Sequence, residues 1–115
     1  METTTTNRTE LNLTVNTYRW GVVTMQQAMD LREAEEAAAK AKVARTGEPV
    51  TRRINVGMYD VHTTSGHYRI ERELDPTTEE PTGWWIVVEY VNGFDAETGL
   101  YFRTLRDAKA HVANI

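Results

Sequence analysis

The sequence predicts an α+β protein, a two-layer sandwich in which an antiparallel sheet of 3-5 strands carries one long Ala-rich helix and one short C-terminal helix. Three observations favour this class. Residues 25–45 contain almost only strong helix formers, with no glycine or proline. Apolar and polar residues alternate in several later segments, as they do in strands. A second helix-capping sequence then lies close to the C-terminus.

The N-terminal part is predicted to form a flexible arm and then one bent strand. Residues 1–9 are polar and Thr-rich, with nothing to pack, whereas 10–115 are expected to form a single α+β domain. From Leu11 to Val15 apolar and polar residues alternate, and the apolar positions then change parity. A bend or bulge near residues 16–17 would explain that change.

The long helix is predicted to begin after Thr24 and to end before Gly47. Thr24 and Gln27 have the spacing of a capping box, and glycine commonly follows the last residue of a helix. One broad face is expected to hold Leu31, Ala34, Ala37, Ala38, Ala41 and Ala44. This face can pack on the protein's own sheet or on a second copy in a homodimer, and the sequence leaves both open.

Two strands joined by a turn are predicted in the middle of the chain. Residues 52–62 alternate with a change of parity at Gly57, where we place a bulge. Residues 63–66 are turn formers and join this strand to the next in a hairpin. The inward-facing side chains of that next strand are expected to be Tyr68, Ile70 and Leu74.

The C-terminal part predicts two more strands and the short helix. Residues 75–83 hold two prolines and no apolar side chain, which indicates an exposed loop. Residues 84–91 are apolar on both parities, as in a central strand, and a turn at 92–93 and a loop at 95–99 lead to a short strand at 100–103. The helix capped by Thr104 is expected to bury Leu105, Ala108, Val112 and Ile115.

Composition excludes several classes of function. The chain has 115 residues and no cysteine, so it has no disulfide, thiolate zinc site or cysteine nucleophile. Its net charge of −4 argues against broad contact with a nucleic-acid backbone. No apolar run approaches the roughly 20 residues that span a bilayer, and no signal sequence opens the chain. We therefore expect a cytoplasmic protein with no membrane partner.

The sequence contains no catalytic signature. Ser65 is its only serine and lies in a predicted turn, and no nucleophile elbow or phosphate-binding glycine pattern is present. His62 and His67 flank that turn and Asp60 shares the parity of His62, so the three could hold a divalent ion. No dedicated ligand spacing supports this, so we expect two exposed histidines, a solvated His111, no metal, no cofactor and no enzymatic activity.

The order of helix, three strands and helix resembles that of double-stranded-RNA-binding domains. The stretch Asp-Ala-Lys-Ala in the closing helix resembles part of that family's motif, although the family's Lys-Lys pair is replaced by residues 104–107. The long helix carries Glu33, Glu35 and Glu36, which would oppose phosphate contacts. The resemblance implies a nucleic-acid-binding module as an alternative function. Its contact residues would be Arg52, Arg53, Arg103, Arg106 and Lys109.

A second resemblance covers about residues 67–113. Three segments carry it, which are Tyr68-Arg69-Ile70, Trp84-Trp85-Ile86-Val87-Val88 and Phe102-Arg103-Thr104-Leu105-Arg106-Asp107-Ala108-Lys109. They resemble a pattern in small uncharacterised proteins, many of them from bacteriophages of actinobacteria. This likeness implies a non-enzymatic accessory protein that binds host or phage machinery as an inhibitor or adaptor.

The expected partner-binding surfaces are an acidic loop, an exposed tryptophan and the outward side of the long helix. The candidate residues of the first two are Asp75, Glu79, Glu80, Trp84 and Trp85. An acidic surface can compete for a basic nucleic-acid channel by charge complementarity. One of the two tryptophans is expected in the core and the other half-exposed on the opposite face of the sheet.

Overall fold

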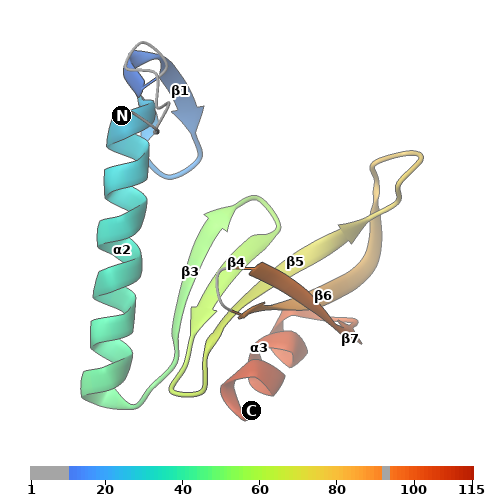
Figure 1. Cartoon of the computed structure of the whole chain (residues 1–115). Helices are drawn as coiled ribbons and strands as arrows, with labels where there is room; N and C mark the ends of the chain where they lie inside the picture. Colours follow the sequence, from blue (N-terminus) through green and yellow to red (C-terminus); the bar gives the residue numbers. More distant parts are fainter. Residues whose placement is uncertain (1–10, 92–93) are drawn as a thin grey trace, which may run out of the picture. The chain divides into compact units, whose positions relative to one another are not determined.

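The computed structural model describes residues 11–91 and 94–115 (Figure 1). The arm predicted at 1–9 and the turn predicted at 92–93 lie outside these residues. The chain divides into two compact units, the first ending at Ala38 and the second spanning Ala39–Ile115.

The first unit contains a hairpin and the beginning of the long helix. Strands β1 (Thr14–Thr17) and β2 (Gly21–Thr24) pair antiparallel, so the prediction of one bent strand is wrong. The Thr17 hydroxyl accepts a hydrogen bond from the Trp20 amide at 3.0 Å and donates one to the Gly21 carbonyl at 2.8 Å. These bonds close a turn, and the parity change in the sequence marks this reversal of the chain.

Helix α2 (Met25–Thr46) begins and ends where the sequence predicts. The Gln27 amide donates to the Thr24 hydroxyl at 3.1 Å and the Thr24 amide donates to the Gln27 side chain at 2.9 Å, which confirms the capping box. Gly47 follows with a φ of 73° and donates its amide to the Val43 carbonyl.

The buried side of α2 differs from the predicted one. Ala39 and Val43 are its buried residues, one helical turn apart, whereas Leu31 and the alanines of the predicted face are exposed. Alanines occur nearly all round the second half of this helix, so their spacing does not single out one face. Val43, the largest apolar side chain there, lies on the side that is buried.

The second unit contains a five-stranded antiparallel meander and a closing helix. The strands follow one another in space as β3 (Val50–Asn55), β4 (Met58–His62), β5 (His67–Leu74), β6 (Pro81–Val91) and β7 (Phe94–Phe102). Helix α3 (Leu105–Ala113) forms a second layer against β5, β6 and β7. The structure therefore confirms the α+β class and the antiparallel sheet.

Three predicted boundaries within the sheet are wrong. Residues 81–83, predicted as the end of a loop, are the first residues of β6. Residues 52–62 are two strands, β3 and β4, and Gly57 lies in the tight turn between them with a φ of 68°. Residues 95–99 are not a loop but belong to β7, whose first four residues are exposed on both faces. A strand of that kind lacks the alternation by which a sequence reveals a half-buried strand.

The core of the second unit lies between the sheet and α3. Its buried residues are Val61, Tyr68, Ile70, Val87, Ala108 and Val112, with Tyr59, Trp85, Phe102 and Leu105 packed against them. Leu74 and Ile115 were expected here but are 47% and 52% exposed. Leu74 follows a register shift in the pairing of β5 with β6, and Ile115 lies beyond the end of α3.

Local capping fixes the start of α3. Thr104 is extended, and its hydroxyl accepts a hydrogen bond from the Asp107 amide at 3.1 Å.

In the described part of the chain, neither α2 nor α3 has an apolar stretch sufficient to cross a membrane.

Candidate functional site

The sheet face that points away from α3 carries a row of polar and aromatic side chains. Ile70 and Val87 point into the core, so the residues next to them in sequence point to the other face. The strand register places His62, His67, Tyr90 and Asp95 in one row across β4 to β7. It places Arg52, Asp60 and Arg69 in the adjacent row across β3 to β5.

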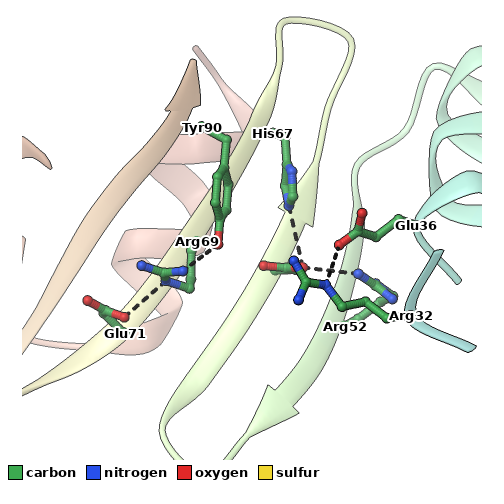
Figure 2. A network of polar contacts seen from close by, with 8 residues as sticks. Arg32, Glu36, Arg52, His67, Arg69, Glu71 and Tyr90 are labelled. Carbon is green, nitrogen blue, oxygen red and sulfur yellow. Dashed lines mark hydrogen bonds and ion pairs between the residues drawn. The ribbon is translucent and has the colours of Figure 1, made fainter. Parts of the chain in front are cut away.

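Asp60 is the centre of this polar face. Its Oδ2 atom lies 3.0 Å from Arg52 Nη2 and 3.4 Å from His67 Nε2. Figure 2 shows Arg52 and His67 directed at the same carboxylate, and the two residues lie on β3 and β5, the strands on either side of β4. The Asp60 and Arg52 side chains are only 5% and 12% exposed, so this is a buried ion pair.

The charges around Asp60 keep its carboxylate ionised. Burial alone would raise the pKa of Asp60, but the hydrogen bond with His67 and the electrostatic interactions with His67, Arg52 and His62 lower it further than burial raises it. The pKa of Asp60 therefore lies below its ordinary value, and the site holds a buried negative charge.

Aromatic rings stack across the strands beside this carboxylate. The His62 and His67 rings lie 4.0 Å apart between centroids at an interplanar angle of 16°, and Tyr90 stacks on His67 at 4.4 Å. His62 and His67 thus face each other across the hairpin, as predicted. The expectation that they are exposed is wrong, because His62 is 2% exposed and His67 is half-buried between His62 and Tyr90.

Arg69, which lies in the adjacent row, contacts Tyr90 and Asp95 of the stacked row. It donates a hydrogen bond to the Tyr90 hydroxyl, and its guanidinium lies 5.2 Å from the centroid of that ring. The same guanidinium pairs with Glu71 at 3.0 Å and with Asp95 at 2.7 Å. Figure 2 shows Arg69 between Tyr90 and Glu71.

A pocket opens beside the two histidines within the second unit. It has a volume of 530 Å³. Its walls are Lys40, Val43 and Ala44 of α2, the turn at 63–66, and the rings of His62 and His67. The histidine pair is therefore accessible from one side, although the carboxylate behind it is buried.

The acidic loop is built around one of its own carboxylates. The Asp75 side chain accepts hydrogen bonds from the amides of Thr77 at 2.7 Å and Thr78 at 3.0 Å. Glu79 and Glu80 are exposed, and Glu79 has a φ of 61°. Asp75 thus orders the loop, which leaves the two glutamates as its solvent-facing acidic groups.

Replacing Asp75 by asparagine is expected to lower the melting temperature at pH 7. The hydrogen bonds from the Thr78 and Thr77 amides lower the pKa of Asp75 below its usual 3.8. The stabilisation by the charged form is then complete above pH 3.8 and is lost as the pH falls through the pKa of the folded state. The melting temperatures of the wild type and Asp75→Asn should converge in thermal scans taken from pH 7 downward below that point. A constant difference would contradict this origin.

The two tryptophans lie on opposite faces, as predicted. Trp85 packs against the core beside Tyr59, with ring centroids 6.2 Å apart. Trp84 is half-buried, contacts Tyr101 edge-on, and has the Arg103 guanidinium 3.8 Å above its ring. The Trp84 face is thus already covered in part by a cation.

Of the five arginine and lysine residues predicted for nucleic-acid contact, Arg52 is mostly buried, whereas Arg103 and Arg106 are exposed. Arg52 pairs with buried Asp60, and Arg103 lies on Trp84. Arg53 and Lys109 both lie over the Tyr59 ring, at 5.8 Å and 4.9 Å from its centroid. His111 was expected in solvent, but it is half-buried against the Phe102 ring.

Sequence reasoning missed Arg69, Tyr90 and Lys40 as neighbours of the histidine pair. For Arg69 and Tyr90, parity within a strand does not indicate which residues lie across from them, and only the strand register does. Lys40 lies on α2, and its place beside the histidines follows from the packing of that helix end. Comparisons of the chain with protein-family models, with curated proteins and with solved structures found no match.

Proposed function

We propose that this protein is a non-enzymatic accessory protein that acts by binding another protein, as an inhibitor or adaptor. The likeness of residues 67–113 to actinobacteriophage-type proteins supports the accessory role. The observation that carries the proposal lies in the first unit. Among its described residues, 11–38, none is buried, and the exposed large apolar side chains are Leu13, Tyr18, Val22, Met25, Met29 and Leu31.

Six large apolar side chains are exposed in a segment of 28 described residues that has no buried residue of its own. Apolar area left in solvent is what a protein partner covers, and methionine adapts to irregular partner surfaces. A two-stranded hairpin is at best marginally stable by itself. A protein partner that covered Val22, Met25 and Met29 would bury this apolar area and stabilise the hairpin at the same time.

The test combines substitution of this surface with capture of a partner. We expect wild-type protein to retain a specific protein from nuclease-treated host lysate, and Val22→Asp with Met29→Asp to lose it. Ile115→Asp is the matched control, since Ile115 and Met29 are 52% and 53% exposed. If the partner is a second copy of this chain, light scattering should give a lower molar mass for the double variant than for the wild type and the control. Equal retention by the double variant would contradict the proposal.

Nucleic-acid binding is the second candidate, and one observation favours it. Arg53 and Lys109, from β3 and α3, lie over the same Tyr59 ring, next to a helix that also exposes Arg106. If the protein has this function, it should bind duplex RNA with an affinity that falls steeply as the salt concentration rises. Arg53→Glu with Lys109→Glu should abolish such binding in fluorescence anisotropy, whereas Arg45→Glu should not. Loss of every captured partner on nuclease treatment would favour this candidate over the first.

A further inference from the structure

We propose that Asp60, His62 and His67 form a binding site for a divalent transition-metal ion, and that Zn²⁺ fits it. One ligand atom of each residue lies within 4.8 Å of the others. Two imidazole nitrogens and one carboxylate oxygen are a ligand set that zinc takes in proteins. This site is separate from the apolar surface of the first unit, so the two proposals stand independently.

The sheet fixes where the three side chains begin. Asp60 and His62 are two residues apart on β4 and therefore point to the same face. His67 is the first residue of β5 and is the direct cross-strand partner of His62. A four-residue turn, 63–66, joins the two strands and holds this register.

A buried oxygen of Asp60 points to a ligand. Oδ2 is engaged by Arg52 and His67, but Oδ1 is buried and accepts no hydrogen bond from any residue that the structure describes. Buried carboxylate oxygens normally have a partner, since leaving one without costs free energy. A cation held by Oδ1 satisfies this atom while Oδ2 keeps its contact with Arg52, which then orients the carboxylate as an outer partner.

The pocket beside the histidines supplies an entry path. It is lined by both imidazole rings and by Lys40 of α2, and its volume of 530 Å³ exceeds what an ion needs. Three protein ligands leave one position of a tetrahedral zinc ion for water or a small ligand. That position would face the pocket, because Asp60 lies on the buried side.

Two features of the site oppose metal binding. An ion lies in the plane of each imidazole that binds it, so rings stacked at 4.0 Å and 16° cannot both point at one ion. His67, whose side chain is 20% exposed against 2% for the whole of His62, is the ring that must turn out of the stack. Arg52 also competes electrostatically for Asp60, so we expect an affinity weaker than that of a closed structural zinc site.

Calorimetric titration of the full, untagged, chelator-treated chain with Zn²⁺ tests this site. We expect one ion per chain and, with Co²⁺ as the probe, a visible absorption band that Zn²⁺ displaces. His67→Phe keeps a ring in the stack but removes a ligand, so it should weaken binding by about 100-fold or more, given that loss of outer partners alone costs roughly 10–100-fold. His111→Gln, which removes the imidazole next to Phe102, is the control and should bind as the wild type does.

A second measurement keeps the test decisive if His67→Phe does not fold by circular dichroism. In the wild type, Zn²⁺ should shift the NMR signals of the His62 and His67 ring protons and leave those of His111 unchanged. If binding is not saturable at about 1 mM Zn²⁺, the dissociation constant is too high for a specific site, and the proposal is overturned. Equal loss of affinity in His111→Gln, or unchanged affinity in a folded His67→Phe, would also overturn it.

Discussion

Replacing Ile70 by alanine is expected to lower the free energy of unfolding by about 3 kcal/mol. Ile70 has no exposed surface and lies in the middle of β5, where it pairs with Tyr59 of β4 and Val87 of β6. Its side chain belongs to the cluster that α3 covers. Hydrogen bonds on both sides hold the strand in place, so the cavity left by the smaller side chain cannot close by moving the backbone.

Leu74→Ala in the same strand is the matched control. The alternation of β5 predicts that both side chains point inward, but Leu74 is 47% exposed. Its truncation should change the free energy of unfolding by no more than about 0.5 kcal/mol. Urea denaturation of the two variants, compared at constant m-value, measures both changes. If both variants lose a similar amount of unfolding free energy, Leu74 packs in the core as Ile70 does, which contradicts its exposure.

Helix boundaries could be predicted because the signals that fix them are local. Thr24 with Gln27 and Thr104 with Asp107 form their hydrogen bonds within one turn of the chain. Gly47 ends α2 through its own positive φ. None of these contacts depends on a residue far away in sequence, so the cap residues alone are sufficient to locate both helix starts.

Strand boundaries are harder to predict than helix boundaries, because two different structures produce the same sequence pattern. A bulge and a tight turn both shift the parity of apolar residues. The sequence predicts a bend or bulge at residues 16–17 and a bulge at Gly57, whereas the chain reverses direction near both places. At Leu74 the reverse applies, because an unbroken alternation hides a register shift in the pairing of β5 with β6.

The sequence predicts which residues could form the candidate metal site, but it does not predict that the site is buried. A turn at 63–66 suffices to bring His62 opposite His67, and the parity of Asp60 adds the carboxylate. The burial of the site was not predictable, because it depends on the stacking of Tyr90 from β6 and the pairing of Arg52 from β3. Both contacts cross between strands whose register a single sequence does not specify.

Replacing Asp60 by asparagine is expected to lower the free energy of unfolding by about 3 kcal/mol in metal-free, chelator-treated protein. Asparagine keeps the shape of the side chain but removes the charge that lies 3.0 Å from the Arg52 guanidinium. Because Arg52 is only 12% exposed, water replaces little of the lost interaction. The cost therefore arises from the lost attraction between a buried positive charge and the carboxylate 3.0 Å from it.

Two further variants separate this cause from a general effect of substitution in the sheet. Glu71→Gln removes a charge 3.0 Å from Arg69, but the Glu71 side chain is 26% exposed, so the loss should be at most about 1 kcal/mol. The pair Arg52→Met with Asp60→Leu removes both charges and should recover most of the stability, since apolar replacement of a buried ion pair is often neutral. Chemical denaturation of the three variants measures these differences. If the double variant is as unstable as Asp60→Asn, shape at this position matters more than charge, and the ion pair is not what holds β3 to β4.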